Sequence, residues 1–269
     1  MNTVVCVLAT YPTDGVGTFE LNREGWSLAD ETSLHRAALL DALRRADALE
    51  SDSVERVLLH AGDLGAEFVA LLKAEGLERW GVMRAQGGVR VEAVAVAQHM
   101  LREGGAGAVV FTWMDTPALT TAELAAAVAA AEGSGGLVRP GAGGVGLGLV
   151  ALPADAPGPG ALFDGVTWGG ADAAQRVLAA LAGDPANDLE KRQPGQLGEP
   201  LTRLVTAADA AQVLEQLEGK ERAEAAGGGR REESSTLRFL REREGGCAPE
   251  AAAVRYVQVR ATAAVTYCH

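Results

Sequence analysis

Cysteine and aromatic residues are both scarce in this sequence. The three cysteines, Cys6, Cys247 and Cys268, are far apart and form neither a CxxC pair nor the dense framework of a secreted disulfide protein. Their spacing favours a reducing compartment. Aromatic residues make up only 4% of the chain, which argues against an aromatic-rich all-β sandwich.

The sequence also lacks an excess of positive charge and long hydrophobic runs. There are 24 Lys and Arg residues against 36 Asp and Glu, for a formal net charge of −12. Nucleic acid is therefore excluded as the expected partner, because binding its phosphates needs clustered basic residues. The first apolar run, "TVVCVLAT" (3–10), lacks a basic flank and is too short for a signal segment or a membrane span. We expect a cytoplasmic protein without membrane association.

Short apolar runs alternate with segments of helical period along the first half of the chain. The pattern predicts strands over 3–10, 54–61, 80–85 and 108–113, and helices over 28–49, 64–76, 91–104 and 122–133. Thr120 and Glu123 have the spacing of a capping box at the start of the last of these helices. This alternation predicts an α/β fold, a Rossmann-like three-layer α/β/α arrangement around a mainly parallel sheet.

The second half contains glycine-rich and then highly charged segments. Residues 136–153 alternate Gly with Val and Leu, which predicts a strand pair whose bare backbone lets another group approach closely. A helix over 171–182, a strand over 202–206 and a closing helix over 207–220 are expected to follow. We therefore place a core domain at 1–219 and a charged linker with a C-terminal extension at 220–269, and expect the core to fold without that extension.

Asp115 follows the predicted central strand in "VVFTWMDTPALT" (109–120). Ligands of open parallel sheets bind at the carboxyl ends of the strands, which makes this residue a candidate site residue. A turn residue whose carboxylate caps the following loop is the alternative. His35, His60 and His99 do not have metal-ligand spacing, and each is interpreted as a solvated or satisfied side chain.

Four stretches, taken in order, resemble one family. They are "ATYPTDGVGTFEL" (9–21), "VVFTWMDTPALT" (109–120), "GLVRPGAGGVGLGLVALP" (136–153) and "LFDGVTWGGADAAQRVLAAL" (162–181). Together they resemble the glycosyltransferase-A (GT-A) fold of molybdenum-cofactor-guanylyltransferase-like proteins, above all the bacterial glycosyltransferases associated with arsenosugar biosynthesis. The second stretch is similar to an apolar-Gly-Thr-Asp-x-Pro-x-Leu motif, and the fourth to Leu-Phe-x-x-Ile-x-Trp-Gly.

The resemblance implies a nucleotide-diphospho-sugar transferase-like domain that acts on a nucleotide or nucleotide sugar and a small-molecule acceptor. It implies that Asp115 is the catalytic residue and holds Mg²⁺ or Mn²⁺. Trp168, which two glycines follow, is interpreted as a platform near the acceptor, with a core Trp that closes a turn as the alternative. Hard carboxylate oxygens and a glycine loop suit a cation and a diphosphate. The binding residues implied are Pro12, Gly15, Gly17, Thr18, Arg23, Trp168 and Gly169.

The sequence departs from the family pattern at charged positions. Thr18 and Glu20 stand where the first loop has Lys and Arg, and Trp113 stands where the second motif has Gly. The acid of the third motif is missing, and a late Asp-x-Asp-Thr-x-x-Asp segment is replaced by "RLVTAADA", which leaves only Asp209. These departures favour the alternative, a catalytically silent descendant of the fold, or pseudoenzyme, that acts as a binding or assembly protein. The retained Asp115, Pro117 and Trp168 favour the transferase, which is the leading interpretation.

Overall fold

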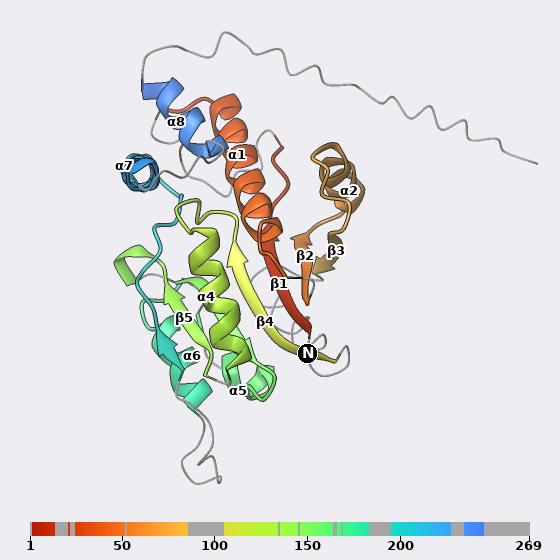
Figure 1. Ribbon diagram of the computed structural model, residues 1–269. Helices are drawn as coiled ribbons and strands as arrows, with labels where there is room; N and C mark the ends of the chain where they lie inside the picture. The colour runs from red at the N-terminus through yellow and green to blue at the C-terminus, as the bar shows by residue number, and fades with distance from the viewer. Residues whose placement is uncertain are drawn as a thin grey trace, which may run out of the picture.

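The computed structural model describes residues 2–13, 21, 25–51, 53–85, 105–133, 135–144, 146–163, 166–167, 169–182, 195–226 and 234–244 (Figure 1). Their strands are β1 (Asn2–Ala9), β2 (Val54–Ala61), β3 (Gly81–Ala85), β4 (Ala106–Trp113), β5 (Leu137–Pro140), β6 (Leu147–Pro153) and β7 (Gln196–Leu197). The helices are α1 (Leu28–Asp47), α2 (Gly65–Ala74), α4 (Thr121–Glu132), α5 (Pro159–Phe163), α6 (Ala173–Ala182), α7 (Ala207–Ala226) and α8 (Ser235–Glu244). None of these helices has the length and hydrophobicity needed to span a bilayer.

The strands form one mixed sheet in the order β3-β2-β1-β4-β6-β5-β7. The pairs β1–β2, β1–β4, β2–β3 and β5–β7 are parallel, and β6 runs antiparallel to both β4 and β5. The predicted mainly parallel sheet is therefore confirmed. The predicted strand pair in 136–153 is also confirmed, as β5 and β6.

Helices cover both faces of the sheet because its central strands are apolar on both sides. In β4, Ala108 and Val110 belong to a core cluster with α1, α2, α4, α7 and α8. Val109, Phe111 and Trp113 point the other way and pack with α5 and α6. The result is the three-layer α/β/α fold expected from the sequence, with α1 and α4 lying over one face of the sheet in Figure 1.

Two helices begin with a capping box. Thr120 and Glu123 form the predicted one at α4, and Ser27 and Asp30 form one at α1 that was not predicted. In each box a side-chain oxygen accepts from a helix N–H that has no partner within the helix. The helix predicted over 91–104 lies outside the described residues.

The prediction of a strand over 202–206 was wrong. Only Leu201 makes an isolated bridge, to Gly141, and residues 202–205 run on as an irregular connection to α7. Leu201 packs onto the bare backbone of Gly148, where a Cβ would lie 3.0 Å from the Leu201 Cβ. The close approach predicted for the glycine-rich segment is thus made by the chain itself.

The C-terminal part of the described chain returns to α1. α7 continues through Gly219 to Ala226, so the boundary predicted at 219 falls inside a helix. α8 packs along α1, and both Leu237 and Leu240 are buried in the larger core cluster.

Candidate functional site at the carboxyl edge of β1 and β4

The two central parallel strands end side by side. β1 ends at Ala9 and β4 at Trp113, and the Met114 N–H, just beyond β4, donates to the Leu8 carbonyl at 3.1 Å. β6 begins at the same edge, because Leu149 pairs with Thr112 in the antiparallel ladder. This edge is where an open parallel sheet offers a binding site, and Asp115 lies directly on it.

Asp115 forms an ion pair with Arg203. Its Oδ2 accepts from Arg203 Nε at 3.1 Å and from a terminal guanidinium nitrogen at 2.5 Å. The residue is only 7% exposed, and Oδ1 is buried without a hydrogen-bond partner among the described residues. In the same connection, the Leu204 N–H donates to the Asp115 carbonyl at 2.7 Å. The irregular segment before α7 therefore binds both the side chain and the backbone of Asp115.

The carboxylate of Asp115 does not cap its own loop. The Thr116 N–H donates to the Trp113 carbonyl, and the Leu119 N–H donates to the Thr116 carbonyl. Backbone carbonyls thus accept from the N–H groups that a capping carboxylate would bind. The carboxylate of Asp115 binds Arg203 instead.

Arg203 is placed near two acids. Burial alone would lower its pKa, but the charge and hydrogen bonds of Asp115 and the charge of Asp209 outweigh burial, and the pKa is raised. Asp209 also caps α7, because its Oδ2 accepts from the Thr206 N–H at 2.8 Å and the Thr206 hydroxyl at 2.9 Å. Arg203 is therefore a permanent positive charge at this edge.

A divalent cation does not fit this arrangement. Mg²⁺ and Mn²⁺ need several oxygen ligands and free carboxylate lone pairs, whereas the guanidinium already occupies Oδ2 and repels a second positive charge. The described residues also contain no group of three His, Cys, Asp or Glu side chains placed to hold a metal ion. The positive charge at the carboxylate of Asp115 is the guanidinium of Arg203.

His35 lies next to this pair. Its Nε2 is 2.9 Å from the Thr10 carbonyl and 3.2 Å from the Met114 sulfur. A carbonyl only accepts, so Nε2 carries the proton. Burial lowers the pKa of His35 to about 4, although the Thr10 hydrogen bond and the charge of Asp115 act to raise it. The imidazole is therefore neutral at physiological pH, which agrees with its interpretation as a satisfied side chain.

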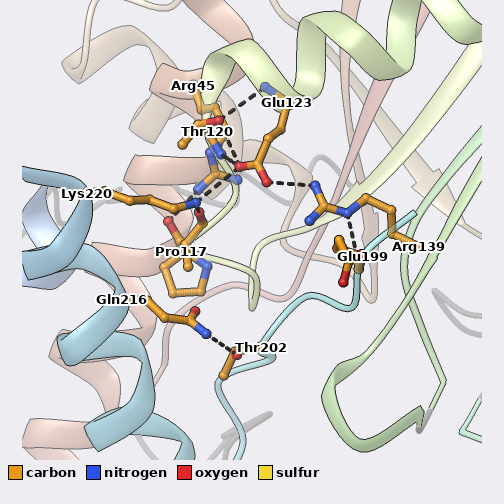
Figure 2. Close-up of polar contacts among 10 residues, drawn as sticks. Arg45, Pro117, Thr120, Glu123, Arg139, Glu199, Thr202, Gln216 and Lys220 are labelled. Carbon is orange, nitrogen blue, oxygen red and sulfur yellow. Dashed lines mark hydrogen bonds and ion pairs between the residues drawn. The ribbon is translucent and has the colours of Figure 1, made fainter. Parts of the chain in front are cut away.

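Charged side chains from α1 and α7 bind the loop between Asp115 and α4 (Figure 2). Arg45 of α1 donates to the Pro117 carbonyl at 3.1 Å, and Lys220 of α7 donates to the Ala118 carbonyl at 2.5 Å. Lys220 and Arg139 of β5 both bind the carboxylate of Glu123, at 3.2 and 2.9 Å. Hydrogen bonds from α1 and α7 thus hold the loop that follows Asp115.

The pKa of Glu123 reflects this network. Burial acts to raise it, but hydrogen bonds from the Thr120 side chain and backbone and from Arg139, with the charge of Lys220, lower it to about 2. The carboxylate therefore stays ionised at physiological pH and keeps its contacts with Arg139 and Lys220.

The structure brings together only some of the predicted binding residues. Pro12 is buried just after β1, and the exposed Gly169 precedes α6. The Gly146 N–H donates to the Gly170 carbonyl, which places the segment with Gly169 beside the start of β6, at the edge that holds Asp115. Gly15, Gly17, Thr18, Arg23 and Trp168 lie outside the described residues.

Arg203 and His35 are the residues that sequence reasoning missed as partners of the site. A signal for Arg203 exists, because it stands at the first acid when "RLVTAADA" is laid on Asp-x-Asp-Thr-x-x-Asp. Trp113, which stands where the second motif has Gly, packs in the core layer toward α6.

Comparisons with known proteins show the fold. No protein-family model matches the sequence, and no curated protein matches it. A solved structure of a protein provisionally described as a nucleotide-diphospho-sugar transferase, from Desulfovibrio desulfuricans G20, matches with a TM-score of 0.69 and 21% identity. That match covers 91% of this chain and 96% of the other. The chain therefore has the nucleotide-diphospho-sugar transferase-like α/β fold.

Two further solved structures are more distant. A nucleotidyl transferase from Methanothermobacter thermautotrophicus has a TM-score of 0.47 and 18% identity over 81% of this chain and 100% of its own. Rv0371c from Mycobacterium tuberculosis, solved with manganese, has a TM-score of 0.44 and 19% identity over 80% of this chain and 99% of its own. At these scores neither similarity carries an argument about the site.

Proposed function

We propose that this protein binds a nucleotide or nucleotide sugar at the carboxyl edge of β1 and β4, and that it is a catalytically silent descendant of the transferase fold. The ion pair between Asp115 and Arg203 is the observation that carries the proposal. The pair lies at the sheet edge where this class of fold binds ligands. In it, Arg203 neutralises the carboxylate that a cation-dependent transferase would use to bind its metal ion. The free, buried Cys6 and the cysteine spacing support a reducing location, which we propose is the cytoplasm.

A second candidate is the active transferase that the sequence resemblance implies, with Mg²⁺ or Mn²⁺ at Asp115 and a small-molecule acceptor near Trp168. One observation favours it. Oδ1 of Asp115 has no hydrogen-bond partner among the described residues, so this oxygen can bind a cation without losing a hydrogen bond. A cation at Oδ1 would be repelled by the guanidinium of Arg203 at Oδ2, so this candidate requires Arg203 to move away from Asp115.

Two measurements on the full chain separate these candidates. Thermal unfolding with a panel of nucleoside diphosphates, triphosphates and nucleotide sugars should show a raised midpoint for at least one ligand, because ligands of the folded state stabilise it. Incubation of the same nucleotide sugars with Mn²⁺ should release no nucleoside diphosphate. The absence of any stabilising nucleotide would refute the binding site. Mn²⁺-dependent release that is lost in Asp115→Asn would establish the transferase instead.

A further inference from the structure

Arg203 is the more exposed partner of the Asp115–Arg203 pair. Its side chain is 18% exposed, against 10% for Asp115. Nε and one terminal nitrogen are both directed to Oδ2 of Asp115, which fixes the plane of the guanidinium. Among the described residues no partner is seen for the other terminal nitrogen, so that N–H group is left for a ligand at the sheet edge.

The charge and geometry of this group suit a phosphate. An arginine guanidinium is always charged, and its fixed N–H donors match phosphate oxygens. Asp115 holds the guanidinium in place through two hydrogen bonds, and the charges of Asp115 and Asp209 raise the pKa of Arg203. A preformed, oriented cation of this kind loses little side-chain freedom when an anion binds.

We infer that Arg203 binds the phosphate groups of the nucleotide directly and takes the place of a divalent cation, so that binding needs no metal. This inference rests on the proposed nucleotide site and specifies its ligand class, a phosphorylated nucleoside. Asp115 is then a positioning residue that orients Arg203.

Calorimetric titration of the full chain tests the metal dependence. The nucleotide that stabilises the protein most is titrated in EDTA and in Mn²⁺, and the corresponding unphosphorylated nucleoside is titrated beside it. We expect equal affinity in EDTA and Mn²⁺, and at least tenfold weaker binding of the nucleoside. Nucleotide binding that appears only with Mn²⁺ would overturn the inference and leave the proposed site standing. The loss of all nucleotide binding under both conditions would overturn the proposed function itself.

Substitutions test the residue assignment. The double variant Arg203→Gln with Asp115→Asn removes both charges, which avoids a buried unpaired ion that would unfold the site. We expect it to fold and to bind the nucleotide at least tenfold more weakly. Arg222→Gln, an equal loss of positive charge on the exposed face of α7, is the matched control and should bind normally. Unchanged affinity in the double variant would overturn the inference.

Arg203→Asp tests the same idea by gain of function. It places a second carboxylate opposite Asp115, the ligand type that Mn²⁺ prefers. Mn²⁺ titration followed by electron paramagnetic resonance should show at least tenfold tighter binding by this variant than by the wild type. Mn²⁺ binding of the wild type that matches the variant and is lost in Asp115→Asn would contradict the substitution of a cation by Arg203.

Discussion

Glu31 and Asp115 are both buried carboxylates, but they are compensated differently. Asp115 has Arg203 on one oxygen. Glu31 is 3% exposed in the first turn of α1, and neither of its oxygens has a hydrogen-bond partner among the described residues. Its position near a helix N-terminus offsets part of its charge, but a buried charge without a hydrogen bond remains costly. Neutralising Glu31 should therefore stabilise the folded protein, whereas neutralising Asp115 should destabilise it.

Glu31→Gln should raise the free energy of unfolding by about 1 kcal/mol, because it removes an unpaired charge and keeps the shape. Asp115→Asn should lower it, because Arg203 then loses its buried partner. Urea unfolding at pH 7 compares the two variants with the wild type. A large loss of stability in Glu31→Gln would show that the carboxylate has a compensating partner in the folded protein.

His35 makes stability depend on pH in a defined window. Its pKa is lowered to about 4 in the folded protein, and an unfolded histidine titrates near ~6.5. The unfolded chain therefore binds more protons between these values, and stability should fall by about 3 kcal/mol as the pH drops from about 6.5 to 4. Urea unfolding across this range should show a much smaller fall in His35→Gln. Parallel curves for the two proteins would exclude His35 as the cause.

At the scale of elements, continuous apolar runs and capping residues were enough to predict β1, β2, β4 and the helices that follow them. The failure at 202–206 has a physical cause, because a short apolar run does not distinguish a strand from a buried connection. Leu204 is fully buried in the core without being in the sheet. Of the Asp115–Arg203 pair, the sequence pointed only to Asp115, because it follows a recognisable strand, whereas Arg203 lies 88 positions away in an irregular segment.

The start of α8 depends on a residue of α1. Asp41 accepts from the backbone N–H groups of Ser235 and Thr236 at 2.9 and 2.8 Å, and from the Ser234 hydroxyl at 2.7 Å. Asp41→Ala should therefore lower the free energy of unfolding by about 1 to 2 kcal/mol, the size of a lost helix cap. Asp63→Ala, which removes an exposed acid paired with Arg84, is the control and should change stability by less than about 0.5 kcal/mol. Equal effects of the two substitutions in urea unfolding would show that the cap contributes nothing.

On the scale of the whole molecule, the C-terminal part of the described chain closes over its N-terminal helix. α8 runs antiparallel to α1, because Asp41 binds its first residues while Arg243, near its end, binds Asp30 at 2.7 Å. The Arg243 guanidinium also lies 3.9 Å from the centre of the Trp26 ring, which packs against Phe239. Trp26 lies just before the start of α1. α8 therefore contributes to the core and also packs against the residues at the start of α1.

Truncation at two points tests whether α8 belongs to the folding unit. A chain of residues 1–244 keeps α8, and we expect it to unfold in urea at the same midpoint as the full chain. A chain of residues 1–233 loses Leu237 and Leu240, which are 2% and 3% exposed, together with the contacts of Arg243. Because burial of a leucine side chain contributes about 1.5 to 3 kcal/mol, this chain should lose about 3 kcal/mol or more and unfold at a lower midpoint. If 1–233 and 1–244 unfold alike, α8 is an appendage, and the boundary near residue 219 describes the domain correctly.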